Sequence, residues 1–167
     1  NAIEITDKTF GKEHTSYVGN LHQLASLHRA MGKYDKALPL FLKTIEINKK
    51  TLSIEHPNSA SGLSKLDSLY QAMGQHKNAL PIIQNAIEIT EKTFGKEHPS
   101  YVGNLHQLAS LHRAMGKYDK ALPLFLKTIE INKKTLGIEH PNYASGLSNL
   151  ASLYQAMGQH KNALALL

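Results

Sequence analysis

The 167-residue chain contains no cysteine and no tryptophan, and only 7% of its residues are aromatic. Without cysteine it has neither a disulfide framework nor thiolate chemistry, which fits a reducing compartment, so we expect a cytoplasmic protein. No apolar run approaches the roughly 18 residues needed to cross a bilayer, and no signal peptide is visible, so we expect no membrane partner. The hydrophobic content of 41% is nevertheless enough to form a folded core.

Negative charge is scarce in parts of the chain, and the net charge is +6. Residues 16–57 and residues 100–141 each carry six lysine or arginine and three acidic residues, which gives +3 in each segment. Residues 58–99 carry four of each sign and are neutral. The basic excess therefore recurs in alternate segments of equal length.

The feature that recurs most clearly is the stretch LHQLASLHRAMGKYDKALPLF, which occupies residues 21–41 and again residues 105–125. Variants of it begin at Leu63 and Leu147, so the spacing is 42 residues throughout. Residues 1–83 and 85–167 agree at 74 of 83 positions, which makes an 84-residue pair of unlike repeats the larger unit. A fixed period of this length is typical of repeat proteins, whose units pack mainly against their neighbours.

Apolar residues at three- and four-residue spacing predict two helices in each repeat. Glycine, which takes positive φ easily, should end the first helix, and proline suits the first position of the next repeat's helix. Pro39, Pro81 and Pro123 fall inside second helices, where we expect a kink rather than a break. The predicted helices are residues 1–10, 16–31, 34–52, 58–73, 76–94, 100–115, 118–136 and 142–157, with a last one that starts near residue 160.

These residues resemble the tetratricopeptide repeat (TPR), in the 42-residue form of kinesin light chains and related bacterial arrays. Armadillo and HEAT repeats have a similar period, but the A-M-G-K-Y-D-K-A turn favours TPR. The tryptophan of the shorter TPR form is replaced by leucine. The family positions in the first helices are Leu21, Leu24, Ala25 and His28; Leu63, Leu66, Asp67 and Tyr70; Leu105, Leu108, Ala109 and His112; and Leu147, Leu150, Ala151 and Tyr154. The small residues of the second helices are Ala37, Ala79, Ala121 and Ala163.

The resemblance implies an all-α fold, a right-handed superhelical solenoid of antiparallel helix pairs. We expect a single array over residues 1–167, with a partial second helix and loop at 1–15, repeats at 16–57, 58–99 and 100–141, and a truncated repeat at 142–167. Asp67 departs from the pattern, because the other copies have alanine at this small buried position. A carboxylate there is costly unless it is hydrogen-bonded or wetted, so we expect a partly open site.

In the family, the first helices line a concave groove that holds extended peptide segments, and the expected function is a non-catalytic protein–protein interaction scaffold. Arg29 and Arg113 are expected to pair with acidic groups of a partner. A solvated face without a ligand is the alternative, since outer faces of solenoids are polar by default. The candidate groove residues are His22, Gln23, Ser26, Arg29, Ser64, Lys65, Ser68, Gln71, His106, Gln107, Ser110, Arg113, Ser148, Asn149, Ser152 and Gln155.

Two other functions stay open from the residues. One is a purely structural array with no dedicated ligand that self-associates head to tail, because residues 160–167 followed by residues 1–10 nearly complete one second helix. The other is binding of single-stranded nucleic acid, which is disfavoured because the groove has no row of aromatic residues for stacking.

We expect no cofactor, no metal and no catalysis. Ten histidines are present, but His22 and His28 are six residues apart and do not share a helix face, and the loop histidines at 14, 56, 98 and 140 are too far apart to converge. Nothing suggests a nucleophile–base–orienter set, a phosphate-binding loop or paired carboxylates.

Overall fold

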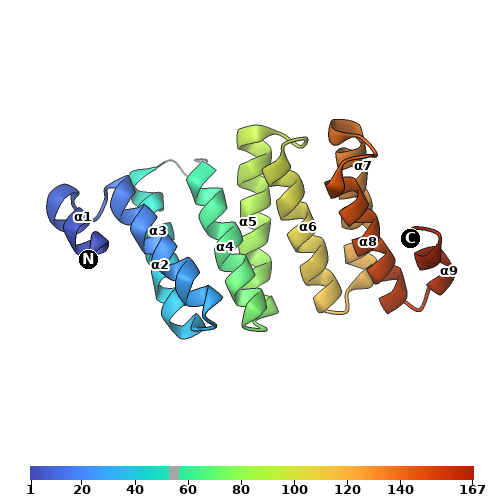
Figure 1. Ribbon diagram of the computed structural model, residues 1–167, viewed down its shortest axis with the longest axis horizontal. Coiled ribbons are helices and arrows are strands. Elements are labelled where there is room, and N and C mark those ends of the chain that lie inside the picture. Colours follow the sequence, from blue (N-terminus) through green and yellow to red (C-terminus); the bar gives the residue numbers. More distant parts are fainter. Residues whose placement is uncertain (53–56) are drawn as a thin grey trace. The chain divides into compact units, whose positions relative to one another are not determined.

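The computed structural model describes residues 1–52 and 57–167, and within these ranges every regular element is a helix (Figure 1). Two compact units, residues 1–93 and 94–167, are each described by themselves. The first contains α1 to α5 and the second α6 to α9, with the boundary at the last residue of α5. The helices are α1 (Ala2–Phe10), α2 (Thr15–Ala30), α3 (Tyr34–Thr51), α4 (Pro57–Ala72), α5 (His76–Phe94), α6 (Pro99–Ala114), α7 (Tyr118–Leu136), α8 (Pro141–Ala156) and α9 (His160–Leu164).

The ends of the first helices are set by glycine, as the sequence predicts. Gly32 follows α2 with φ of 69°, its N–H donates to the carbonyl oxygen of Arg29, and the N–H of Lys33 donates to that of His28. These two bonds form a Schellman motif, which satisfies carbonyls that the helix end would leave unpaired. The same turn closes α6 at Gly116.

The starts of the first helices combine proline with a histidine cap. Pro99 and Pro141 occupy the first turns of α6 and α8, where a missing N–H removes no helical hydrogen bond. Just before them, the Nδ1 atoms of His98 and His140 accept hydrogen bonds from the backbone N–H two residues on, each at 3.1 Å. His14 caps α2 in the same way at 3.2 Å, and position 56 lies outside the described residues.

The second helices run without a break through their internal prolines. Pro39 is the sixth residue of α3, and Pro81 and Pro123 occupy the same place in α5 and α7. Each ring removes one backbone hydrogen bond near the helix start, yet the apolar residues continue on the same face beyond it. Packing of that face therefore holds the helix together across the weak point.

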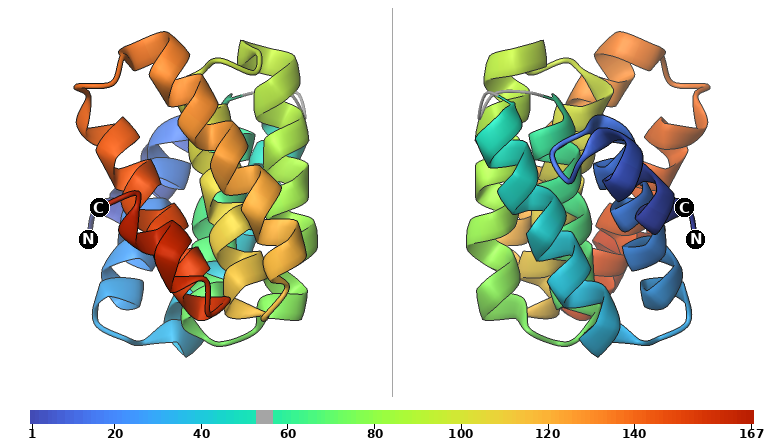
Figure 2. Two further views of the ribbon diagram at one scale, coloured as in Figure 1. Left: turned by 90° about the vertical axis from the view of Figure 1, so that its right-hand side faces the viewer. Right: turned by 90° about the vertical axis from the view of Figure 1, so that its left-hand side faces the viewer.

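In the first unit, α2 packs against α3, α3 against α4, and α1 against α2 (Figure 2, right). Ala25 and Ala37 are fully buried, so the small side chain on each helix lets the pair approach closely. Tyr17, Leu21 and Ile47 form an apolar cluster beside this contact. The three-residue turn between α2 and α3 makes them an antiparallel pair.

The second unit repeats this packing with the residues 84 positions later. α6 packs against α7, α7 against α8, and α8 against α9 (Figure 2, left). Ala109 and Ala121 are fully buried at the α6–α7 contact, and Phe125, Ile129, Leu150 and Leu153 complete the core cluster. No helix in the described part of the chain is long and apolar enough to span a bilayer.

Asp67 contradicts the expectation of a partly open site, because its side chain on α4 is fully buried. One carboxylate oxygen, Oδ2, accepts a hydrogen bond of 2.7 Å from the Gln71 amide, while Oδ1 is buried without a hydrogen-bond partner among the described residues. Burial raises the pKa of Asp67 to about 7, and the bond from Gln71 opposes this rise only in part. The expectation was wrong because close packing of the helices leaves no opening at this position.

Candidate functional site

The sixteen residues predicted to line a groove lie on α2, α4, α6 and α8, four on each helix. The half-buried ones are His22, Ser26, Ser64, Ser68, Gln71, His106, Gln107, Ser110, Arg113 and Asn149, and the exposed ones are Gln23, Arg29, Lys65, Ser148, Ser152 and Gln155. All sixteen therefore keep some contact with solvent, so a ligand can reach them.

Several hydroxyl groups of these first helices bond to their own helix. On α8, the Ser148 and Ser152 hydroxyls donate to carbonyl oxygens four residues earlier, at 3.2 and 3.0 Å. Ser64 and Ser68 make the same bonds on α4, at 2.9 and 3.0 Å. Such back-bonding commits the hydroxyl hydrogen, so these serines can offer a ligand only acceptor lone pairs.

A pocket of about 300 Å³, which we call pocket I, opens between α2, the end of α3 and α4 in the first unit. It brings together His22 and Lys65, which the sequence analysis placed in the groove from different repeats. The other side chains around it come from the loop before α2 and from the three helices. Its lining residues are Glu13, Thr15, Val18, Gly19, His22, Asn48, Thr51, Leu52, Asn58, Ser61, Gly62 and Lys65.

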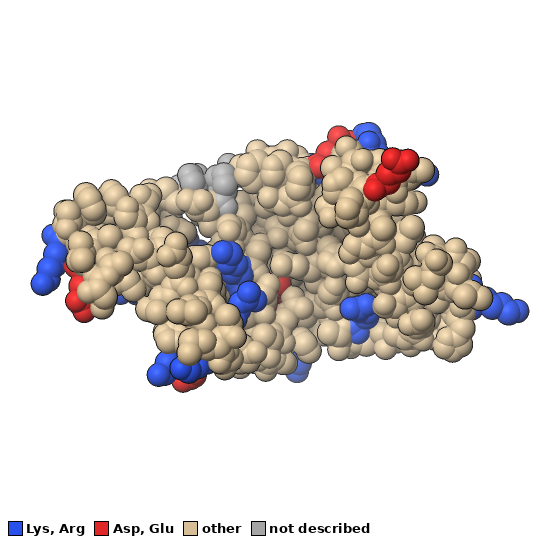
Figure 3. Space-filling view, in the orientation of Figure 1, with Lys and Arg blue, Asp and Glu red and all other residues tan. Residues whose placement is uncertain are grey.

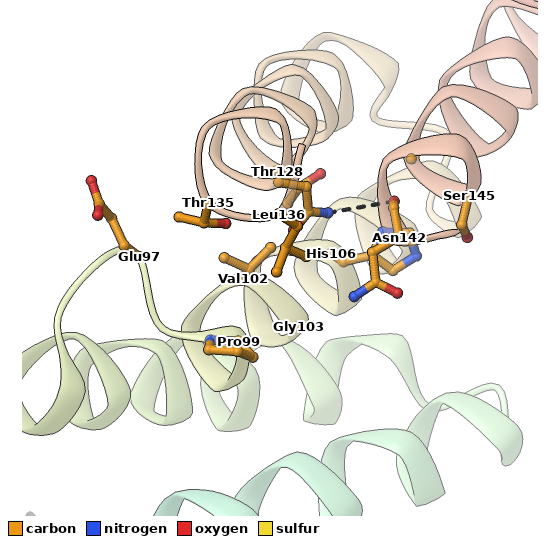
Figure 4. A pocket seen from close by; sticks show the side chains of 12 residues that line it. Glu97, Pro99, Val102, Gly103, His106, Thr128, Thr135, Leu136, Asn142 and Ser145 are labelled. Carbon is orange, nitrogen blue, oxygen red and sulfur yellow. Dashed lines mark hydrogen bonds between the residues drawn. The ribbon is translucent and has the colours of Figure 1, made fainter. Parts of the chain in front are cut away.

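A second pocket of about 330 Å³, pocket II, lies between α6, α7 and α8 in the second unit (Figure 4). Eleven of its twelve lining residues stand 84 positions after a residue of pocket I. The Asn132 amide donates to the backbone carbonyl of Asn142 across the pocket at 3.5 Å. Its lining residues are Glu97, Pro99, Val102, Gly103, His106, Thr128, Asn132, Thr135, Leu136, Asn142, Ser145 and Gly146.

Glycines on the first helices create the room in both pockets. A Cβ atom added at Gly19 or Gly103 would meet no other atom within 4 Å, so it would project into open space. On the opposite wall, a Cβ at Gly146 would lie 2.8 Å from Cγ1 of Ile129, and one at Gly62 would lie 3.4 Å from Cγ1 of Ile45. Gly62 and Gly146 therefore let α4 and α8 approach the preceding helix, while Gly19 and Gly103 leave the pockets open.

A neutral imidazole forms one wall of each pocket. His22 and His106 lie edge-on to Phe41 and Phe125, with ring centroids 5.4 and 5.3 Å apart. Burial is the main reason that the pKa of both histidines is lowered, and the nearby charges of Lys65 and Arg113 respectively lower it further. Both rings are thus uncharged at neutral pH, and each can donate at one nitrogen and accept at the other.

The two pockets differ in charge at one wall. In pocket I, Nζ of Lys65 lies 2.5 Å from Nε2 of His22, so the neutral ring accepts a hydrogen bond from the ammonium group. The matching residue in the second unit is Asn149, whose amide donates to the carbonyl oxygen of Ser145 at 2.8 Å. Pocket I therefore carries a cation where the second unit has a neutral amide.

The two predicted arginines lie outside these pockets. The Arg113 guanidinium sits 5.9 Å from the ring centroid of Phe125, a cation–π contact that holds it against α7. Arg29 is exposed on α2. Neither arginine contributes to the pocket walls.

No three histidine, aspartate or glutamate side chains converge as metal ligands in residues 1–52 and 57–167. His14, His98 and His140 instead cap helices, as described above. His112 is buried on α6. Its pKa is lowered chiefly by burial and also by Lys120 and Lys117, with Asp119 acting in the opposite direction.

Sequence reasoning missed the asparagines that line the pockets. Asn48 and Asn132 stand near the ends of the second helices α3 and α7, and Asn58 and Asn142 begin α4 and α8. They were overlooked because only the middle of the first helices was taken to line the groove. Their recurrence 84 residues apart was visible in the sequence, but nothing in the pattern placed the second-helix ends beside the first helices.

Comparison with known proteins supports the same repeat type. The tetratricopeptide repeat family matches residues 21–58, 68–100 and 101–167. No curated protein matches the sequence. A crystal structure of nearly identical TPR-like repeats, from a protein assigned as a kinesin light chain in Podosopora anserina, is 35% identical with a TM-score of 0.85 and covers 98% of this chain and 78% of its own.

A second crystal structure of those repeats gives a TM-score of 0.86 at 34% identity, with 98% of this chain and 77% of that chain covered. BtubC (BKLC) from P. vanneervenii has the same fold at 19% identity, with a TM-score of 0.82 over 91% of this chain and 61% of its own. The repeated helix pairs, the family match and these relatives lead to one assignment: the chain belongs to the tetratricopeptide repeat family, whose repeats generally serve as non-catalytic protein-interaction scaffolds.

Proposed function

We propose that the chain is a non-catalytic scaffold that binds an extended peptide segment of a protein partner across its first helices, with peptide side chains seated in pockets I and II. One observation carries this proposal. The same pocket is formed twice, by residues 84 positions apart, in two units that each supply all of its walls. Both units are then parts of one repeat array with a repeated binding surface.

The size and chemistry of the pockets suit a side chain of a peptide. At about 300 and 330 Å³ they stand at the small end of ligand sites, so each holds one residue rather than a large cofactor. Asparagine and histidine provide hydrogen-bond donors and acceptors, while Val18 and Val102 provide apolar surface. A peptide meets such a surface with its backbone between pockets and its side chains inside them.

Repetition strengthens weak binding. Once one determinant of a partner is bound, a second determinant meets the other pocket at a high effective concentration, which raises the overall affinity without any new contact. A repetitive or multivalent partner therefore suits this chain best. Within each unit, the candidate groove residues on the first helices would contact the backbone of the peptide beside the pocket.

Nucleic acid fits the surface less well than a peptide. On the face shown in Figure 3, lysine and arginine side chains are scattered among uncharged residues rather than gathered in one basic patch. Backbone-tracking sites for single strands need a continuous positive groove together with stacking aromatic residues. The protein partner is therefore the function that we argue.

The pocket glycines provide a test that spares the fold. Peptides are first selected from a random 12-residue phage-display library against the unmodified chain. Gly19→Ala and Gly103→Ala each add one methyl group to open space inside a pocket. We expect each variant to weaken the selected peptides about tenfold in isothermal titration calorimetry, because overfilling a site costs about 1–3 kcal/mol.

Thermal unfolding of the same variants is the control. Alanine replaces glycine in a helix interior at both positions, so stability should stay equal or rise by about 0.5–1 kcal/mol. Loss of binding without loss of stability supports the pockets as the site. Failure to select any peptide, an affinity in both variants that is unchanged from that of the unmodified chain, or stronger binding to an oligodeoxythymidine strand would contradict the proposal.

A second candidate function is self-association, and exposed apolar side chains on the outermost helices of each unit favour it. Ile5 and Phe10 of α1 are 63% and 57% exposed. Leu164 of α9 and the neighbouring Leu167 are 77% and 78% exposed. We propose that α9 of one copy meets α1 of another, since apolar surface of this kind is stabilised when it is covered.

A further inference from the structure

Pockets I and II are built from nearly identical residues, so the few differences between them carry the information about what each accepts. Among the nine positions at which residues 1–83 and 85–167 differ, Lys65 and Asn149 form the pair in which a lysine is replaced by a neutral amide, and Asn149 is not among the residues that line pocket II. Lys65 lines pocket I, while Asn149 stands at the equivalent place on α8. The shape of the two sites is shared, and their hydrogen-bonding chemistry is not.

The ammonium group of Lys65 has capacity for an anionic ligand. It donates one hydrogen bond, to His22, and its side chain is exposed and lines pocket I, so two further N–H donors remain accessible to a ligand. His22 is neutral and does not compete for an anion. A carboxylate in this position would make a charge-assisted hydrogen bond, which is roughly twice as strong as a neutral one.

The remaining charge on pocket I does not cancel this preference. Glu13, in the loop before α2, is the other charged residue in the lining, and it is exposed. It also acts on Lys50, whose pKa is raised by the hydrogen bond and charge of Glu46 first and by Glu13 last. The equivalent Glu97 of pocket II forms an ion pair with Lys134. Both carboxylates belong to the loop end of their pockets, and Lys65 belongs to α4.

Asn149 offers the opposite chemistry. One N–H of its amide is engaged by the carbonyl oxygen of Ser145, so the carbonyl oxygen and the second N–H remain for a ligand. The amide carries no net charge, so it lacks the charge-assisted attraction that Lys65 offers a carboxylate. A neutral side chain that carries an N–H or O–H donor, such as an amide or hydroxyl, is complementary to it.

We propose that pocket I accepts a carboxylate side chain of the partner peptide at Lys65, and that the second unit accepts a neutral amide or hydroxyl side chain at Asn149. The two otherwise equivalent units thereby select different residues of a partner. This inference rests on the proposed peptide-binding function and adds the class of residue that each unit selects.

Exchange of the two residues tests the proposal with variants that the chain itself supplies. The random 12-residue library is panned separately on the unmodified chain, on Lys65→Asn and on Asn149→Lys. We expect aspartate and glutamate to be enriched with the unmodified chain, to lose that enrichment with Lys65→Asn, and to rise further with Asn149→Lys. Each change installs the residue that the same fold carries 84 positions away, so the variants should keep their unfolding temperature.

One selected acidic peptide is then used in a double-mutant cycle. Lys65→Asn should weaken it about tenfold, replacement of its acidic residue by the matching amide should weaken it equally, and the two changes together should cost no more than either alone. Binding of the acidic peptide should also fall more steeply with salt than binding of the amide peptide.

The possible outcomes distinguish failure of the proposed selectivity from failure of the proposed peptide-binding function. Selected peptides without acidic enrichment, or an acidic peptide whose affinity does not change with Lys65→Asn, would overturn the selectivity while the scaffold function stands. If none of the three proteins selects any peptide, both the selectivity and the scaffold function are overturned. A phosphoserine peptide that binds more tightly than its aspartate equivalent would show that phosphate, rather than carboxylate, is the preferred anion.

Discussion

Asp67 lies where the three other repeats carry alanine, at Ala25, Ala109 and Ala151. The equivalent site in the other repeats holds a methyl group, and the Asp67 carboxylate loses its hydration when it is buried there. The hydrogen bond from Gln71 replaces only part of the lost interaction with water. In the unfolded chain the carboxyl titrates near 3.8, whereas in the folded chain its pKa is about 7. Between these values the folded protein holds a proton that the unfolded chain has released.

The consequence is a pH-dependent loss of stability, since the free energy of unfolding falls as pH rises wherever the folded state binds more protons. We predict that Asp67→Ala stabilises the protein little near pH 4 and by roughly 2–4 kcal/mol above pH 7. Urea unfolding across pH 4–8 measures this difference. The histidines whose pKa is lowered act in the opposite direction below pH 6.5, but they are present in both proteins and cancel in the comparison.

Asp67→Asn is the matched control because it keeps the shape and the bond to Gln71 and removes the titration. Relative to the unmodified chain, the free energy of unfolding of Asp67→Asn should increase from pH 4 to pH 8 by the same amount as that of Asp67→Ala, because neither variant has a carboxyl that titrates at this position. A difference between Asp67→Ala and the unmodified chain that stays constant from pH 4 to pH 8 would mean that the carboxyl does not titrate in the folded protein.

At the scale of single helices, local signals determine where each element begins and ends. The predicted bounds lie within one residue of the observed ones for α2 and α6, because Gly32 and Gly116 enforce the left-handed turn that ends them. The sequence pattern predicts that the histidine before proline belongs to the loop, whereas the structure shows that its ring provides the N-cap of α6 and α8. This role was hidden because histidine is not among the residues preferred at that position.

We predict that His140→Ala destabilises the protein by about 1 kcal/mol, as loss of an N-cap acceptor does. Asparagine at this position can accept the same bond from the Asn142 N–H, so His140→Asn should restore most of the loss. Guanidinium unfolding of the three proteins measures both effects. Position 140 is the cleanest site for the test, because the rings of His14 and His98 also stack on Phe10 and Phe94. Equal destabilisation by alanine and asparagine would assign the effect to the ring rather than to the cap.

The candidate site was harder to predict than the helices because it depends on which elements meet. The first helices were placed correctly, and His22 and Lys65 were both anticipated in the groove, but their contact follows from the packing of α2, α3 and α4. Asn48 is absent from the prediction because only first helices were expected to line the groove, yet its end of α3 reaches the pocket. In the sequence, Gly19 appears only as a residue that is unfavourable inside a helix. The open space around it in the structure shows that it keeps pocket I open.

At the scale of the whole molecule, each unit supplies a complete pocket from its own residues. A partner can therefore bind one unit alone with low affinity. A partner that binds both units gains overall affinity, because the second contact forms at a high effective concentration. The peptide-binding groove, the cytoplasmic location and the absence of catalysis stay predictions. Membership of the tetratricopeptide repeat family and the helical-repeat fold are established by the comparisons.

The proposed contact between copies is tested by sedimentation velocity over a range of protein concentrations. We expect the unmodified 18.5 kDa chain to form larger species as concentration rises, since α9 and α1 expose apolar side chains. Leu164→Lys places a charge in the proposed contact and should keep the chain monomeric. Leu42→Lys, at a residue 45% exposed on α3, is the control and should leave association unchanged. A single monomeric species for the unmodified chain at every concentration would rule out the contact.

Three of the nine differences between the two halves lie on one helix. Positions 59, 65 and 67 on α4 correspond to Tyr143, Asn149 and Ala151 on α8, whereas α2 and α6 differ only at their first residue. The proposed difference in recognition between the two units therefore lies on α4 and α8. Replacing α4 by the sequence of α8, or the reverse, would produce a protein with two alike recognition sites. The side chain that each hybrid prefers would follow from the helix it received.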